Sequence, residues 1–172
     1  MSKISKIIAL TAMIALVFGI ATIDNAVAGE TVQEKLRSVF QYFKAEAAKV
    51  GDVPGHVVGV AEAKGLTFTD KGDVGAYSVQ VMFDYVNGSG PHQGYVTSTF
   101  EDGSTTVTKV EGTTTAVKGG KISLFKGKYT YIKGTGRYEG IKGGGSYTGK
   151  RVTPMAAGAY CYSDSTGTYT LP

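Results

Sequence analysis

The amino-acid sequence predicts an all-β protein, a barrel of roughly eight antiparallel strands preceded by one amphipathic helix. Three observations support this fold class. Residues 29–172 hold 24 glycines in 144 residues, more than twice the usual share of about 7%. Residues 76–86 alternate apolar and polar side chains over an unusually long run. No helical segment separates the strands expected after residue 53, so they should pair antiparallel; closure into a barrel removes exposed edges, and a sandwich is the alternative.

Residues 1–28 have the features of a secretory signal peptide. Lys3 and Lys6 precede an apolar run over residues 7–20, and Ala26-Val27-Ala28 forms an A-x-A cleavage site. The apolar run is shorter than the roughly 20 residues that a membrane-spanning helix needs, so we expect cleavage rather than anchoring. The mature protein would then be an exported bacterial protein, periplasmic or extracellular, without a membrane span.

The charge of the mature chain does not favour a nucleic-acid partner. Without Lys3, Lys6 and Asp24, the chain keeps 16 basic and 13 acidic residues, a net charge of +3. The basic residues are spread along the sequence and form no stripe that could follow a phosphate backbone. The single cysteine, Cys161, cannot form an internal disulfide. We expect it to be a buried strand residue, with an intermolecular bridge or a reactive thiol as alternatives.

The segment 31–50 predicts the N-terminal helix. Thr31 is placed as the N-cap, Glu34 completes a capping box, and Gly51 ends the helix. The helix would cover the sheet or bind a partner. The predicted domains are therefore the signal peptide (1–28), the helix (29–52) and the barrel (53–172). Apolar residues recur at helical spacing at Val32, Leu36, Val39, Phe40, Phe43, Ala47 and Val50.

Strands are predicted from Val53 onward. Within 76–86, we expect the apolar face to point inward and Asp84 to lie on the opposite face, with an inward Asp84 as the alternative. The Asp102-Gly103 pair indicates a hairpin. The expected strands are 76–86, 94–100, 104–110, 121–125, 129–133, 137–141, 146–152, 157–162 and 166–171.

Two patterns that resemble cofactor motifs do not favour a cofactor. Residues 144–150 have the G-x-x-x-x-G-K spacing of a phosphate loop. The loop requires a following helix, whereas Pro154 and the residues before it favour a strand. His56 and His92 lie 36 residues apart and have no zinc-ligand spacing with Cys161. We therefore expect no nucleotide, metal or other cofactor.

Five residues are candidates for ligand contacts. His92 is expected in a glycine-rich loop after the strand that carries Asp84 and Tyr85, and loops at a barrel mouth often bear the polar groups of a ligand site. Tyrosines can hold aromatic or lipid-like ligands. A solvated histidine, a solvated carboxylate and structural tyrosines are the alternatives. The candidates are Asp84, Tyr85, His92, Tyr95 and Arg137.

Residues 75–152 resemble the allene oxide cyclase-like barrels and the related dirigent proteins. The resemblance lies in the run from Gly94 through Phe100-Glu101-Asp102-Gly103-Ser104 to Gly112, and in Gly134-Thr135-Gly136-Arg137-Tyr138-Glu139-Gly140. It implies an eight-stranded antiparallel barrel with a central cavity, and often a trimer. The cyclases isomerise a fatty-acid epoxide with a shaped cavity, an acidic residue and bound water, whereas dirigent proteins steer the coupling of phenoxy radicals. No catalytic residue is carried over from either group.

The sequence therefore favours an exported barrel that binds a small apolar or aromatic ligand without catalysis. The first alternative is a cyclase-like isomerase that uses cavity shape and one acid, for which Asp84, Glu101 and Glu139 are candidates and Arg137 would steer an anion. This alternative requires one of these carboxylates to point into a closed cavity. The second alternative is a structural or adhesion module.

Overall fold

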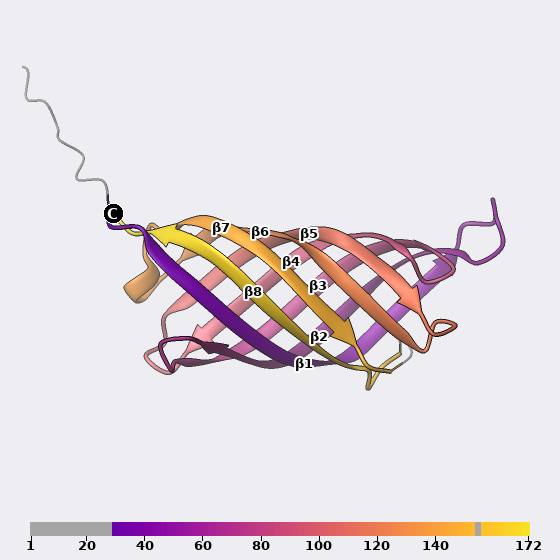
Figure 1. Cartoon of the computed structure of the whole chain (residues 1–172), viewed down its shortest axis with the longest axis horizontal. Helices are drawn as coiled ribbons and strands as arrows, with labels where there is room; N and C mark the ends of the chain where they lie inside the picture. The colour runs from indigo at the N-terminus through magenta and orange to yellow at the C-terminus, as the bar shows by residue number, and fades with distance from the viewer. Residues whose placement is uncertain (1–28, 154–155) are drawn as a thin grey trace, which may run out of the picture.

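The computed structural model describes residues 29–153 and 156–172, which form a closed barrel of eight antiparallel strands (Figure 1). Each strand pairs with the next along the chain, and β8 closes the barrel against β1. This confirms the predicted barrel; the predicted signal peptide lies outside the described residues. The strands are β1 (Val32–Lys49), β2 (His56–Thr69), β3 (Val74–Val86), β4 (Gly90–Phe100), β5 (Thr105–Val117), β6 (Ile122–Gly134), β7 (Lys142–Arg151) and β8 (Tyr160–Thr170), with the 3₁₀ turn η1 (Gly136–Tyr138) between β6 and β7.

The predicted N-terminal helix is wrong, because β1 occupies its place. From Glu34 to Tyr42, every second side chain points into the barrel, and the inward face includes the polar Glu34 and Ser38. Val39 and Phe43 lie exposed on the outer face of β1. Because apolar residues occur on both faces of the strand, their spacing in the sequence imitates the period of a helix. A register shift after Tyr42 further obscures the alternation. The barrel therefore starts at β1 rather than at residue 53.

Several predicted strand boundaries are also corrected. The segments 121–125, from Ile122 onward, and 129–133 both belong to β6, and β8 joins the end of 157–162 with 166–171 into one strand. The segment 137–141 is not a strand: it holds the end of η1 and a turn, and Gly136 at the start of η1 and Gly140 in the turn adopt positive φ angles of 59° and 73°. The stretch with phosphate-loop spacing lies within β7, which begins at Lys142 rather than at the predicted residue 146.

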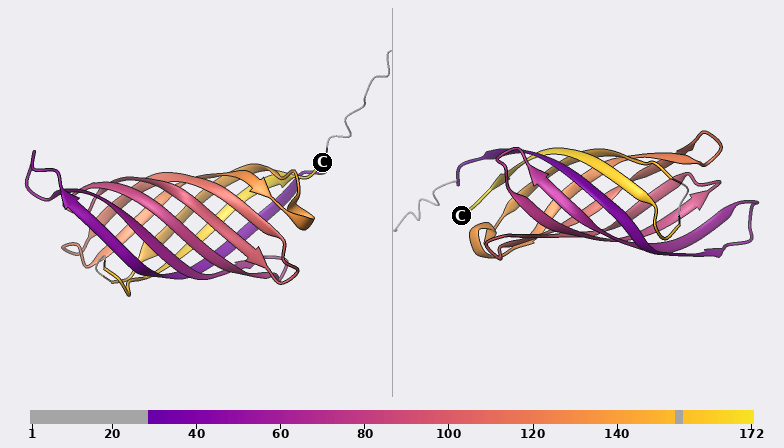
Figure 2. Two further views of the ribbon diagram at one scale, coloured as in Figure 1. Left: turned by 180° about the vertical axis from the view of Figure 1, so that it is seen from behind. Right: turned by 90° about the horizontal axis from the view of Figure 1, so that it is seen from below.

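The two ends of the barrel differ. The start of β1, the C-terminus and η1 lie together at one end, here called the terminal end, and the β1–β2 hairpin projects from the other, here called the hairpin end (Figures 1 and 2). The terminal end is filled by a cluster of Phe100, Tyr138, Ile141 and Tyr169. η1 therefore helps to close this end. Among the described residues, no helix is long and apolar enough to cross a membrane.

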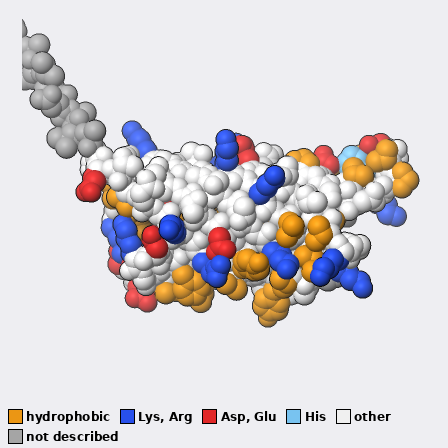
Figure 3. Space-filling view, in the orientation of Figure 1, with side chains coloured by type: hydrophobic (Ala, Val, Ile, Leu, Met, Phe, Trp, Pro, Cys, Tyr) orange, Lys and Arg blue, Asp and Glu red, His pale blue; other side chains and the backbone are white. Residues whose placement is uncertain are grey.

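The outer surface mixes charged and apolar side chains (Figure 3). Val39 pairs with Leu66 on β2 and with Tyr162 on β8, and all three are at least 38% exposed. Beside them, Arg37 and Asp164 form a two-bond ion pair of 2.6 and 2.8 Å. Along each strand, side chains point alternately to this outer surface and into the barrel. The inward side chains therefore define the candidate site.

Candidate ligand site inside the barrel

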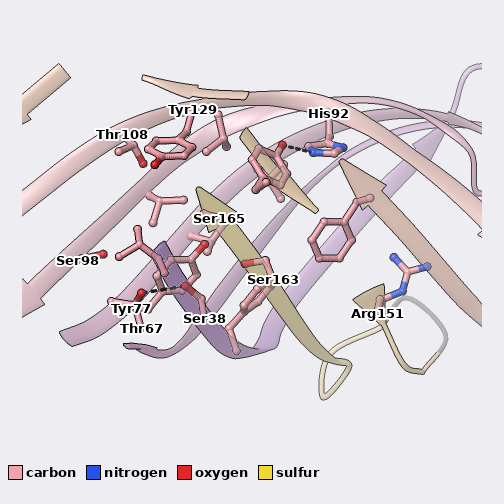
Figure 4. A pocket seen from close by; sticks show the side chains of 18 of the residues that line it. Ser38, Thr67, Tyr77, His92, Ser98, Thr108, Tyr129, Arg151, Ser163 and Ser165 are labelled. Carbon is pink, nitrogen blue, oxygen red and sulfur yellow. Dashed lines mark hydrogen bonds between the residues drawn. The ribbon is translucent and has the colours of Figure 1, made fainter. Parts of the chain in front are cut away.

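A cavity of about 100 Å³ lies inside the barrel and is lined by side chains from all eight strands (Figure 4). Its walls combine aromatic rings such as Phe40 and Phe125 with the hydroxyl groups of serine, threonine and tyrosine. An apolar cavity of roughly 150 Å³ can hold benzene. At about two-thirds of that volume, the cavity is smaller than one that holds a single ring, so an aromatic ligand requires the lining side chains to move apart, and the hydroxyl groups supply polar partners for its substituents.

One polar pair in the cavity is built over two glycines. His92, Gly112, Gly127 and Tyr147 face one another in register on the four neighbouring strands β4 to β7. A Cβ atom on Gly112 would lie 2.6 Å from Tyr147 Oη and 2.9 Å from His92 Nε2, and one on Gly127 would lie 2.5 Å from Tyr147 Oη. Because both central residues are glycine, His92 and Tyr147 meet above them, with 2.7 Å between Nε2 and Oη.

The pair extends into a relay of four side chains. His92 Nδ1 lies 3.1 Å from Thr114 Oγ1, which lies 2.8 Å from Tyr85 Oη. Burial lowers the pKa of His92 and raises the pKa of Tyr147, so both groups are neutral at neutral pH. Each member can donate or accept a hydrogen bond, so the direction of the relay can reverse when the imidazole changes tautomer. All four side chains line the cavity.

A second polar pair uses the same arrangement nearer the terminal end. Glu34, Gly167, Gly145 and Tyr129 are in register on β1, β8, β7 and β6. The Tyr129 hydroxyl donates to Glu34 Oε1 at 2.7 Å, and Tyr131 Oη lies 2.7 and 2.8 Å from the two carboxylate oxygens. Burial and then the Glu34 carboxylate raise the pKa of both tyrosines. Tyr129 and Tyr131 line the cavity, whereas Glu34 does not.

Arg151 supplies a charge at the hairpin end of the cavity. Its side chain is only 6% exposed and lines the cavity, on the opposite side from His92 (Figure 4). Its contacts include Ser123 Oγ, to which Nη2 donates at 2.7 Å, and the Thr153 carbonyl oxygen, to which Nε donates at 3.1 Å. Burial raises the pKa of the Cys161 thiol to about 12, and the Arg151 charge partly opposes this shift.

The structure brings together two of the five predicted ligand residues. Tyr85 and His92 face the cavity and join through Thr114, although His92 lies within β4 rather than in a loop. The other three predicted residues lie outside the cavity: Asp84 and Tyr95 are exposed on the outer face, and Arg137 is exposed on η1.

These three residues have other partners or surroundings. Asp84 Oδ1 lies 2.7 Å from His56 Nε2. Arg137 pairs with Asp73 at 3.2 Å, so it ties η1 to the turn after β2. Tyr95 is 47% exposed. None of them is placed to contact a ligand in the interior.

Among the acids considered for a cyclase-like isomerase, none faces the interior: Asp84, Glu101 and Glu139 are all exposed. This alternative is therefore wrong for these residues. The buried carboxylate is Glu34, which sequence reasoning missed because it was assigned to a capping box. The available signal was the alternation of Glu34 with Ser38 and Phe40 on one strand face. Similarly, Tyr147 lies within the apparent phosphate loop and Arg151 directly follows it, and that motif gives no signal that either side chain lines a cavity.

Comparison with known proteins gives one distant structural likeness. No family model matches the chain, and no curated protein matches its sequence. A match among solved structures is "Structure of the pterocarpan synthase dirigent protein GePTS1", with 11% sequence identity and a TM-score of 0.45, covering 84% of this chain and 93% of that chain. At this TM-score, the likeness adds nothing to the barrel that the strand pairing establishes. The resemblance to allene oxide cyclases stays a prediction.

Proposed function

We propose that the protein binds a small apolar or aromatic molecule inside the barrel, without transforming it. The observation that carries this proposal is the cavity of about 100 Å³, enclosed by aromatic rings and hydroxyl groups from all eight strands. Burial of a single ring there would remove apolar surface from water, and the hydroxyl groups would orient its substituents. The cavity is too small for a ligand of several rings.

The bonds among the lining groups support binding rather than catalysis. His92 is held at both ring nitrogens by Thr114 and Tyr147, and Thr114 also bonds Tyr85. Among the described residues, Glu34 is the only carboxylate that accepts hydrogen bonds from the lining side chains. Tyr129 and Tyr131 enclose it. Such an arrangement gives a rigid, preorganised pocket. The proposal also includes export from the cell, which the predicted signal peptide supports, and assembly into a homo-oligomer, which the sequence resemblance supports.

The test is binding of benzyl alcohol to the purified protein, measured by isothermal titration calorimetry and by ligand-observed NMR. We expect saturable binding to one site. Val110→Phe fills the cavity from its wall and should abolish binding, whereas Val60→Phe, on the exposed face of β2, should leave it intact. Absence of binding to the wild type, or equal binding by the Val110→Phe variant with a folded circular-dichroism spectrum, would overturn the proposal.

A further inference from the structure

The outside of the barrel carries large apolar side chains side by side on three neighbouring strands. Val39 on β1 lies opposite Leu66 on β2 and opposite Tyr162 on β8. Hydrophobic side chains gather along the lower side of the molecule in Figure 3, with Lys and Arg side chains among them. A contiguous apolar patch on a protein surface is typical of a site that contacts a partner or a membrane. This outer apolar band consists of the exposed residues Val39, Phe43, Leu66, Tyr160 and Tyr162.

A β-bulge contributes Phe43 to the band. The pairing of β1 with β2 shifts between Tyr42 and Lys44, so Phe43 has no residue opposite it on β2. Its ring lies outside the barrel, with Lys64 Nζ 5.2 Å from the ring centroid. Bulges commonly redirect a side chain. An exposed ring beside an ammonium group suits a membrane surface, where aromatic rings lie at the level of the headgroups and lysines reach the phosphates.

Two further lysines lie at the other edge of the band. Lys150 on β7 is opposite Tyr162, and Lys126 on β6 is opposite the residue two positions before Lys150. Both lysines line a groove of about 490 Å³ on the outer face, together with Tyr162 and three threonine side chains. Among the described residues, neither they nor Lys64 form an ion pair with an acid. Ammonium and hydroxyl groups are good donors to phosphate oxygens.

The acids near the band already have basic partners. Asp164, which also lines the groove, forms two bonds with Arg37. Glu62 on β2 lies 3.6 Å from Lys44 Nζ. The band is therefore flanked by uncompensated positive charge. A second copy that presented the same face would bring these like charges together, whereas an anionic surface would neutralise them.

We propose that the outer apolar band binds the surface of an anionic lipid bilayer, with Lys64, Lys126 and Lys150 at the lipid phosphates. Such binding combines burial of apolar side chains at the headgroup boundary with attraction between basic residues and anionic lipids. The contact is peripheral, because charged side chains stand among the apolar ones. The inference goes beyond the proposed function, since the cavity and its ligand take no part in it.

The test is co-sedimentation of residues 29–172 with lipid vesicles. These residues contain all eight strands of the closed barrel and leave out the apolar run 7–20, which could bind lipid by itself. We expect at least about tenfold tighter binding to vesicles of phosphatidylcholine and phosphatidylglycerol in equal parts than to phosphatidylcholine alone. Added salt should weaken the binding. Equal binding to both vesicles, or binding to neither, would overturn the inference.

A pair of double variants tests the lysines. Lys126→Gln with Lys150→Gln should weaken binding to the anionic vesicles at least about fivefold. The matched control is Lys133→Gln with Lys142→Gln, which removes the same charge from exposed positions on the same two strands, seven and eight residues away. The control should stay within about twofold of the wild type. An equal loss in both double variants would show attraction by net charge alone and overturn the assignment to this face.

A second pair of variants tests the apolar contact. Phe43→Ser should weaken binding to the anionic vesicles at least about threefold, because it removes a ring from the band. Tyr95→Ser is the control: Tyr95 lies on the outer face of β4, away from the band, and is 47% exposed, compared with 50% for Phe43. Both variants should keep the circular-dichroism spectrum of the wild type. Equal binding by the two variants would overturn the inference.

The other possible occupant is a second copy of the chain, which analytical ultracentrifugation without lipid detects. Self-association that Phe43→Ser abolishes would make the band an interface between copies and overturn the inference. Self-association that Phe43→Ser leaves unchanged would place that interface on another face and support it. Binding of benzyl alcohol in the cavity is measured separately, so failure of the membrane inference leaves the proposed function standing.

Discussion

Two polar pairs inside the barrel share one construction, a polar side chain and a tyrosine that meet across two glycines on the intervening strands. In the Glu34–Tyr129 pair, the carboxylate is enclosed and does not line the cavity. In the His92–Tyr147 pair, both partners line the cavity. The same construction thus serves stability at the terminal end and leaves groups accessible to a ligand at the hairpin end.

The energies of the two pairs support this difference. A glycine in a strand interior costs about 0.5–1 kcal/mol relative to alanine, so each pair costs about 1–2 kcal/mol in its two glycines. Hydrogen bonds to a charged group contribute about 1.5–3 kcal/mol each, and Glu34 accepts from two tyrosines, Tyr129 and Tyr131. The bond between His92 and Tyr147 is neutral and contributes about 0.5–1.5 kcal/mol. Stability alone therefore explains the glycines around Glu34 better than those around His92.

The largest expected effect is that of Glu34→Ala. The substitution leaves the Tyr129 and Tyr131 hydroxyl groups without their common acceptor, so the free energy of unfolding should fall by about 3–5 kcal/mol. Urea unfolding followed by circular dichroism measures the loss. Glu30→Ala, at an exposed position before β1, is the control and should change stability by less than about 0.5 kcal/mol. A loss below about 1 kcal/mol for Glu34→Ala would show that the enclosed pair is not structural.

A smaller effect is expected for Gly112→Ala. The added Cβ would clash with the Lys126 backbone carbonyl oxygen on β6 and with both His92 and Tyr147, so the two strands must shift and the pair must separate, at a cost of about 1–3 kcal/mol. Unlike Glu34→Ala, this substitution should also weaken binding of benzyl alcohol, because it moves two cavity walls. Thr113→Ala, on the outer face of the same strand, should change neither property. Unchanged ligand affinity in Gly112→Ala would remove the functional contrast between the two pairs.

Tyr147→Phe tests the cavity-facing pair with the least disturbance of packing. It removes one neutral hydrogen bond, so stability should fall by only about 0.5–1.5 kcal/mol. Without the Tyr147 hydroxyl, the ligand-induced shift of the His92 imidazole NMR signals should also change. Thr148→Ala, whose side chain points outward from the next position, is the control. A stability loss comparable to that of Glu34→Ala would mean that this pair too is mainly structural.

The sequence predicts the barrel well and its interior poorly. The alternation in 76–86 and the Asp102-Gly103 turn depend on neighbouring residues, and both are found in the structure as β3 and the β4–β5 turn. The interior pairs instead depend on register across four strands, which places His92 beside Tyr147 over the two glycines. Polar inward residues on β1 also break the apolar alternation that identifies a strand. The most informative side chains were thus the least visible in the sequence.

The smallest expected effect is a difference between the pKa values of the two histidines, His56 and His92. Hydrogen bonds to Asp84 and then Asp52 raise the pKa of His56, which lies on the outer face, whereas burial lowers the pKa of His92. His56 therefore stabilises the fold below its unfolded pKa of about 6.5, and this contribution is lost as the pH rises through the higher folded value. His92 has the opposite sign: its contribution is present above about pH 6.5 and is lost as the pH falls toward its lower folded value. Imidazole NMR titration should therefore give a midpoint above about 6.5 for His56 and one below about 6.5 for His92. Asp84→Asn should lower only the midpoint of His56. A His92 midpoint at or above about 6.5 would contradict its burial in the cavity wall.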